Sequence, residues 1–445
     1  MKSFFTGLAF ILPVTLSAQA QSDSLNVLMI VVDDLNDWVG ALKGHPDALT
    51  PNIDRLAERG MLFTNAYASS PLCGPSRAAL LSGIRASTSG LHDNKGLYAE
   101  NPVLKTVENI PQFLKRNGYR TFASGKVFHE YQPQFWDMSI PNNSRMYQAG
   151  QPKKHGYSVP GIFDFGPLDI PTEQMDDYKM TQFAIDRLSE KHEKPFFIAC
   201  GIYLPHLPWY APEEYFKPFS PENISIPLIN PDDLNDLSAE AVKITNPAYY
   251  KQVAIHGPEF HKLAVRSYLA SIHFADAMVG RILDALDKSI YRNNTIIILL
   301  GDNGNHLGEK NKWHKDDLWD ESTHVPLIIH VPGINQKQKS CDRMVSLLDI
   351  YPTLANLLNI PPPSHLEGRS LVKLLKKPES VWKHAVISNR RPGQFSVRTD
   401  KWCYIRYQNG TKELYDRKKD PNEWKNLSDI KKYRAVKKGL KKNLR

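Results

Sequence analysis

Short runs of apolar, often β-branched residues recur along the chain, with amphipathic stretches between them. The clearest runs cover residues 26–32, 195–203, 295–300 and 326–331. Runs of this kind are typical of strands that are buried on both faces of a parallel sheet. Apolar residues at three- and four-residue spacing predict helices over residues 53–59, 107–116 and 260–286. This alternation predicts an α/β fold with a large, mixed, mostly parallel sheet flanked by helices.

The pattern changes near the C-terminus. Shorter runs there predict antiparallel strands over residues 385–388, 395–398, 402–407 and 413–415. Asn409-Gly410 between the last two runs is a strong hairpin signal. We expect a catalytic domain over residues 21–375 and a small C-terminal α+β subdomain over residues 376–445. Residues 130–175 and 205–258, rich in Pro, Asn, Gly and aromatics, are predicted to be long loops.

The N-terminus has the pattern of a secretory signal peptide. Lys2 precedes an apolar run over residues 4–16, and Ala18-Gln19-Ala20 has the small-x-small form of a cleavage site. We therefore expect residues 1–20 to be removed and the protein to be exported, to a periplasm or to the medium. No cysteine follows the cleavage point and no later apolar run reaches ~20 residues, so no membrane anchor is expected.

Composition adds a charge bias. Of the 445 residues, 23% are charged and 41% hydrophobic, as in soluble globular proteins, but the formal net charge is +9. A basic exported protein favours anionic partners such as sulfated glycans, anionic membranes or nucleic acid. The segment 431–445 carries a large share of this charge, and a solvated helix face is the simpler interpretation of it. The four widely spaced cysteines exclude a disulfide-rich scaffold.

Two polar pairs follow predicted strands. Asp33-Asp34 ends the first apolar run, and Asp302-Asn303 follows the third. Ligands of open α/β sheets bind beyond the carboxyl ends of the strands, so these pairs are expected to meet in one site. Strand-end acids also cap turns and helices, and the pairs alone do not separate the two interpretations.

The most specific segment is Leu72-Cys73-Gly74-Pro75-Ser76-Arg77, followed by Ala-Ala-Leu-Leu-Ser-Gly over residues 78–83. A cysteine at the start of a helix lies at its positive end, where thiol chemistry is tuned. Arg77, one turn later, is placed to hold an anion beside it. Judged by the cysteine alone, a buried structural residue is an equal alternative.

The complete segment resembles the signature of type I sulfatases, in which this cysteine is oxidised to formylglycine by a formylglycine-generating maturation enzyme. Other blocks resemble the same family in order: residues 32–34, 50–54, 125–129, 205–206, 301–304, 307–309, 323–326, 414–416 and 420–423. The resemblance covers nearly the whole mature chain and implies an alkaline-phosphatase-like fold. The Gly-Lys-Val-Phe-His block and the C-terminal block are most similar to the iduronate-2-sulfatase branch.

The resemblance implies one calcium ion. Its ligands are expected to be Asp33, Asp34, Asp302, Asn303 and residue 73 as formylglycine. Three carboxylates and an amide supply hard oxygen donors, which suit calcium better than a thiophilic metal.

Further catalytic roles are also implied by the resemblance. Lys126 and Lys315 are expected to place positive charge on the sulfate oxygens. Lys312 and His314 compete with Lys315, which is preferred because the spacing from Trp313 matches the iduronate branch.

Two histidines are implied to move protons. His129 is expected to assist the chemistry of the aldehyde hydrate, and His206 to protonate the leaving alkoxide. Either is otherwise a structural histidine, since the chain has 15.

The resemblance points to a 2-O-sulfated uronate or hexose of a polysaccharide, taken as a terminal residue. Candidate sugar contacts are His92, Trp209, Tyr210, Trp313 and His314. Aromatics in such loops are as often packing anchors.

Two other functions fit the same scaffold. One is a phosphate or phosphonate ester hydrolase, which usually binds two zinc ions and uses Ser or Thr as nucleophile. Here Asn303 and two lysines stand where a second metal would need ligands. The other is a glycan-binding protein without activity, which would be expected to lose catalytic positions. No nucleic-acid partner is expected.

Overall fold

The computed structural model describes residues 24–141, 163–245, 247–334 and 339–444. The predicted signal peptide, residues 1–20, and part of the loop expected over residues 130–175 lie outside these ranges. In the described part of the chain, no helix combines the length and the apolar character needed to cross a membrane.

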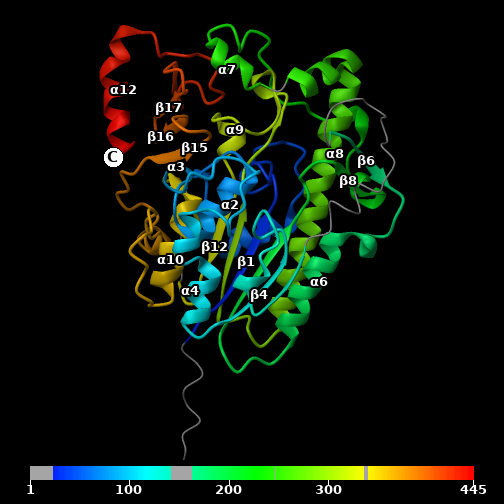
Figure 1. Ribbon diagram of the computed structural model, residues 1–445. Helices are drawn as coiled ribbons and strands as arrows, with labels where there is room; N and C mark the ends of the chain where they lie inside the picture. The colour runs from blue at the N-terminus through cyan, green and yellow to red at the C-terminus, as the bar shows by residue number, and fades with distance from the viewer. Residues whose placement is uncertain (1–23, 142–162, 246, 335–338, 445) are drawn as a thin grey trace, which may run out of the picture.

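An eight-stranded sheet lies at the centre of the protein (Figure 1). The strand order is β13 (Ser340–Cys341), β2 (Met61–Phe63), β12 (Leu327–His330), β9 (Thr295–Gly301), β1 (Asn26–Val32), β7 (Phe196–Ile202), β4 (Arg120–Gly125) and β5 (Met138–Ile140). Only β12 runs against its neighbours, and all other pairs are parallel. The predicted mixed, mostly parallel sheet is confirmed, and the four apolar runs form β1, β7, β9 and β12 within one residue of their expected ends.

Helices cover both faces of this sheet, and β1 is therefore buried along its whole length. Alternate residues of β1 belong to two hydrophobic clusters, one on each face. The first cluster includes α1 (Pro51–Arg59), α6 (Asp176–Ser189) and α8 (Pro247–Lys288). The second includes α2 (Cys73–Ser82), α4 (Ile110–Arg116) and α10 (Ile350–Leu357). Figure 1 shows these two helix layers on opposite sides of the sheet.

A second, antiparallel sheet follows near the C-terminus, as predicted. Its strands are β15 (Val386–Asn389), β16 (Phe395–Arg398), β17 (Trp402–Arg406) and β18 (Lys412–Asp416). The Asn409-Gly410 hairpin joins β17 to β18, and Gly410 has the positive φ of 88° that this turn requires. The helix α12 (Arg434–Leu440) packs on this sheet.

Two boundaries differ from the sequence-based expectation. The loop predicted over residues 205–258 contains β8 (Trp209–Pro212) and α7 (Ala239–Lys243), and it ends at Pro247, where α8 begins. Gly257, at φ 79° and ψ −172°, leaves helical geometry and makes a kink that divides α8 into two helical parts, with Pro258 at the start of the second part. The helix α4 starts at Ile110 rather than at residue 107 because Asn109 forms a capping box with Gln112.

Candidate active site

Two adjacent strands bring the acidic pairs together. The strands β1 and β9 are parallel neighbours in a register that pairs Val32 with Gly301, so Asp33-Asp34 and Asp302-Asn303 follow side by side. The backbone N–H of Asp34 donates to Asp302 Oδ1 at 3.0 Å, and Asn303 Nδ2 donates to Asp34 Oδ1 at 2.9 Å. All four side chains are buried. The oxygens therefore converge at the carboxyl end of the sheet.

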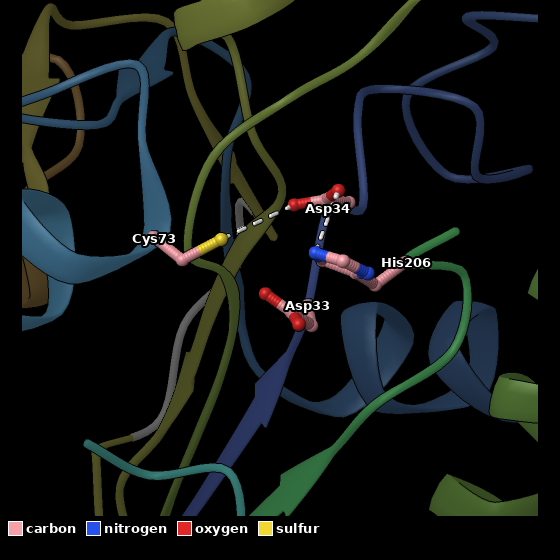
Figure 2. Close-up of side chains that lie close together, drawn as sticks. All are labelled: Asp33, Asp34, Cys73 and His206. Atoms are coloured by element: carbon pink, nitrogen blue, oxygen red, sulfur yellow. Dashed lines mark hydrogen bonds and ion pairs between the residues drawn. The ribbon is translucent and has the colours of Figure 1, made fainter. Parts of the chain in front are cut away.

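Cys73 faces this cluster from the first residue of α2. Its Sγ lies 3.7 Å from Asp34 Oδ1. Figure 2 shows Cys73, Asp33, Asp34 and His206 directed toward one another from three different segments of the chain. One donor atom from each of these four residues lies within 4.8 Å of the others. This spacing and the oxygen donors fit a metal site, with Asp302 and Asn303 hydrogen-bonded to it.

Arg77 joins the segments that form the cluster. Its guanidinium donates to Asp302 Oδ2 at 2.6 Å, to Asp33 Oδ1 at 3.1 Å and to the backbone carbonyls of Lys126 and Val127. The side chain has no exposed surface. The sequence predicted that Arg77 binds an anion. In this structure Arg77 binds two carboxylates, those of Asp33 after β1 and Asp302 after β9.

Two lysines reach the same cluster. Lys126 Nζ donates to Asp33 Oδ2 at 2.5 Å. Lys315 Nζ lies 2.6 Å from Cys73 Sγ and also donates to Asp34 Oδ1. The competing Lys312 turns away, because its Nζ donates to the carbonyl of Ile244 at 2.6 Å. Three carboxylates thus meet three cations in a buried space, which offsets part of the cost of burying each charge.

These charges set the protonation of the acids. Burial by itself would raise the pKa of Asp33, but Lys126 and Arg77 hold that pKa well below its usual value. Burial likewise opposes ionisation of Asp34, and Lys315 with His206 lowers its pKa. Burial raises the pKa of Cys73 to about 12. At neutral pH residue 73 is therefore a thiol, a weak nucleophile as it stands.

His206 has a defined tautomer. Its Nδ1 donates to the carbonyl of Leu207 at 2.7 Å, since a carbonyl only accepts, and Nε2 lies 3.9 Å from Asp34 Oδ2. Burial lowers the pKa of His206 to about 4, although Asp34 opposes the shift. Burial and then Lys315 lower the pKa of the neighbouring His314 to about 3. His129 is half-buried and follows Lys126 by three residues.

The candidate sugar contacts occupy different surroundings. Trp209 and Trp313 are completely buried, with ring centroids 6.2 Å apart, and Trp209 also packs on Tyr268. Core packing thus accounts for both rings without a sugar. The buried hydroxyl of Tyr210 donates to Asp164 Oδ2. His92 is half-buried and lines a cavity of about 480 Å³.

Sequence reasoning missed a clamp on the residue that follows Lys315. Arg390 and Arg391 each place Nη2 within 3.1 Å of Asp316 Oδ2, and Arg390 Nε donates to the backbone carbonyl of Asp316 at 2.7 Å. Asp316 and His314 both have positive φ, at 75° and 72°, so the backbone on either side of Lys315 is held in a strained form. The arginines follow β15, more than seventy residues away in sequence, and no local signal connects them to this loop.

Comparison with known proteins decides the family. The sequence model of the sulfatase family matches residues 25–360. The chain belongs to the sulfatase family. A second family model, described as the C-terminal part of N-sulphoglucosamine sulphohydrolase, matches residues 308–445 of this sulfatase. The enzyme is therefore a sulfuric ester hydrolase.

Individual relatives agree with this assignment. The sulfatase is 34% identical to a protein named sulfatase from Formosa agariphila, over 95% of this chain and 87% of that one. It is 31% identical to human iduronate 2-sulfatase, over 82% and 75% of the two chains. Among solved structures, phosphonate monoester hydrolase of Agrobacterium radiobacter superposes with a TM-score of 0.80 at 23% identity, covering 94% of each chain. That likeness shows the alkaline-phosphatase-like fold, which the sequence predicted.

Proposed function

We propose that this sulfatase uses a formylglycine made from Cys73, with one calcium ion, to remove 2-O-sulfate from a uronate or hexose of a sulfated polysaccharide. The observation that carries the proposal is the position of Cys73. It starts α2 facing two aspartates, with Lys315 Nζ at 2.6 Å from its sulfur. Burial and Asp33 raise the pKa of this thiol to about 12, although Lys126 and Lys315 oppose the shift, so the cluster does not favour a thiolate. After conversion by a formylglycine-generating enzyme, residue 73 would present the oxygens of a hydrated aldehyde to the cluster in place of the sulfur.

Asp33, Asp34, Asp302 and Asn303 would hold the calcium, with residue 73 as a further oxygen donor. All four side chains are buried and carry oxygen; Asp34 is hydrogen-bonded to Asp302 and Asn303, and Arg77 joins Asp33 to Asp302. Such oxygens match the donors that calcium prefers. When bound, calcium supplies positive charge for a sulfate oxygen. The hydrated formylglycine supplies two hydroxyls on one carbon, one to attack sulfur and one whose loss of a proton expels sulfate.

Other side chains are assigned by their positions. Lys126 and Lys315 would bind the outer sulfate oxygens and stabilise the charge that spreads over them in the transition state. His206 would protonate the leaving alkoxide through Nε2, since Nδ1 is held by Leu207. Burial favours the neutral imidazole, whereas an anionic sulfate ester bound beside it favours the protonated form. His129 would assist the aldehyde hydrate.

The sugar class is inferred from the relatives. Human iduronate 2-sulfatase is named for a 2-sulfate on a uronate, and its similarity spans most of both chains. The predicted signal peptide supports export, and an exported enzyme would meet sulfated polysaccharide as an external polymer. We therefore favour a glycosaminoglycan-like substrate that is cut at a chain end.

A phosphonate or phosphate ester hydrolase is the alternative, given the fold likeness to phosphonate monoester hydrolase. A two-zinc site needs more anionic or imidazole ligands than a calcium site. Here Lys315 and Asn303 both donate to Asp34, and neither is an anionic or imidazole ligand. Two metal ions beside the ammonium group of Lys315 would be repelled by it. A single-metal site is therefore favoured, and with it sulfate over phosphate chemistry.

The test is sulfate release, followed by ion chromatography, from defined oligosaccharides that carry 2-O-, 6-O- or N-sulfate. The protein is produced together with a formylglycine-generating enzyme, and mass spectrometry verifies the conversion of residue 73. Sulfate is expected from 2-O-sulfated uronate or hexose ends. Release only from 6-O- or N-sulfated sugars would refute the substrate assignment. Faster hydrolysis of a matched phosphonate ester would refute the proposed chemistry.

Calcium is expected to stabilise the folded protein, because a ligand that binds only the native state adds to its free energy of unfolding. At a hundredfold excess over its Kd the gain is about 2.7 kcal/mol. The measurement is the unfolding midpoint after EDTA treatment and after return of Ca²⁺, Mg²⁺ or Zn²⁺. Asp34→Asn should abolish the shift. A larger shift with Zn²⁺ than with Ca²⁺ would contradict the calcium assignment.

A further inference from the structure

The end of the chain is strongly basic. After Asp429 the sequence holds eight lysines and arginines and no carboxylate side chain, against a net charge of +9 for the whole protein. Ordinary solvated helix faces mix both signs of charge. This segment does not, so its charge is a feature that a general solubility role leaves unexplained.

The segment is fixed to the fold. Tyr433, Val436 and Leu440 pack with Tyr404 and Leu414 of the C-terminal sheet. The helix α12 therefore lies along the sheet at the edge of the molecule (Figure 1). Exposed cations lie on this segment away from its buried positions: Arg434 and Lys438 on α12, and Lys441 and Lys442 in the 3-10 turn that follows it. Lys441 reaches back to the sheet, where its Nζ lies 6.0 Å from the ring centroid of Tyr404.

The two faces of the C-terminal sheet pack against different parts of the protein. Cys403, Ile405 and Tyr415 pack against Leu318 and Trp319, which follow Lys315 in the active-site loop. Tyr404 and Leu414 point to the other face, where α12 lies. The C-terminal sheet therefore lies between the basic helix and the active-site loop and packs against both.

The sheet adds two cations to the helix. Arg406 and Lys412 are directly opposite each other on β17 and β18, an arrangement in which like charges repel. Lys441 reaches the same sheet through its contact with Tyr404 on β17. Burial and then repulsion by Lys412, Arg406 and Lys437 lower the pKa of Lys441. In the part of the chain that the structure describes, no carboxylate forms an ion pair with Arg406, Lys412 or the exposed cations of α12. Among the described residues, therefore, no ion pair offsets this repulsion.

We propose that this basic ridge, defined as Arg406, Lys412, Arg434, Lys438, Lys441 and Lys442, binds a sulfated polysaccharide chain outside the active site. The inference rests on the proposed function, because the bound polymer is the substrate itself. A polyanion neutralises the repelling cations and releases counterions, as it does on other basic surfaces. A second contact on the same chain raises the effective concentration of sulfated ends at the catalytic site.

The test compares two quadruple variants. The ridge variant combines Arg434→Gln, Lys438→Gln, Lys441→Gln and Lys442→Gln, since glutamine keeps a high helix propensity. The control variant combines Lys105→Gln, Lys191→Gln, Lys194→Gln and Lys288→Gln, which remove the same charge from exposed positions elsewhere. Both are made with Cys73→Ala for binding and with converted residue 73 for activity. Circular dichroism and unfolding midpoints verify the folds.

Binding is measured on immobilised heparin and on chemically desulfated heparin over a series of salt concentrations. The ridge variant is expected to bind heparin at least about tenfold more weakly, with a salt dependence lower by about three charges, whereas the control stays within about twofold of the parent. Equal affinities for the ridge variant and the parent would overturn the proposal. So would ridge-dependent binding that is tighter to double-stranded DNA or to anionic vesicles than to heparin.

Activity separates this inference from the proposed function. With a polymeric substrate the KM of the ridge variant is expected to rise at least about fivefold, in line with the lost second contact, while kcat/KM on a sulfated disaccharide stays unchanged. An unchanged KM on polymer would refute the ridge and leave the catalytic proposal intact. Absence of sulfate release from the disaccharide by the parent enzyme would refute the catalytic proposal, and heparin binding would still test the ridge.

Discussion

Replacement of Cys73 by alanine is expected to lower kcat at least about a thousandfold, because the variant has no residue that can become formylglycine. The fold should persist, since Lys315 keeps its contacts with Asp34 and Asn303 after the sulfur is removed. The measurement is sulfate release by protein that has passed through the maturation enzyme. Calcium-dependent stabilisation should remain, although weaker by one donor.

A matched control is Cys200→Ala. Cys200 is also a fully buried free cysteine, but it lies on β7 and its Sγ faces the carbonyl of Met180. Its loss removes a small apolar contact and should cost stability without a comparable loss of kcat. Activity of Cys73→Ala within tenfold of the parent would contradict the formylglycine mechanism.

Replacement of Arg77 by alanine is expected to destabilise the fold by about 3–5 kcal/mol, because it leaves Asp33 and Asp302 without a buried counter-charge. It also removes the donors that hold the carbonyls of Lys126 and Val127, so activity should fall with stability. Chemical denaturation with and without calcium measures the free energy of unfolding. Calcium should recover part of the loss, because it supplies positive charge to the same carboxylates.

Arg55→Ala is the control for this variant. Arg55 also pairs with a carboxylate, Asp284, but both side chains are partly exposed, so the pair should contribute less than about 1 kcal/mol. Similar losses for Arg55 and Arg77 would show that the buried network is not the source of the stability.

Some features of the fold follow from local sequence. The runs that form β1, β7, β9 and β12 are continuous and apolar because both faces of the sheet are covered, so they stand out without any partner. The hairpin at Asn409-Gly410 is equally local, since its turn geometry depends on two residues. The short strands β2, β5 and β13 were missed because two or three residues carry no periodicity. These segments are strands only because they pair with neighbouring strands in the folded sheet.

The sequence by itself determined the sheet class, the family motif around Cys73 and the position of two acidic pairs at strand ends, because each depends on residues close together in the chain. Tertiary structure decided how these parts combine. Only the register of β1 and β9 places Asp34 beside Asp302, and only the folded loop turns Lys315 toward Cys73 while Lys312 turns away. The clamp on Asp316 comes from Arg390 and Arg391, which follow β15, and it was not visible in sequence because contacts between distant segments leave no local pattern.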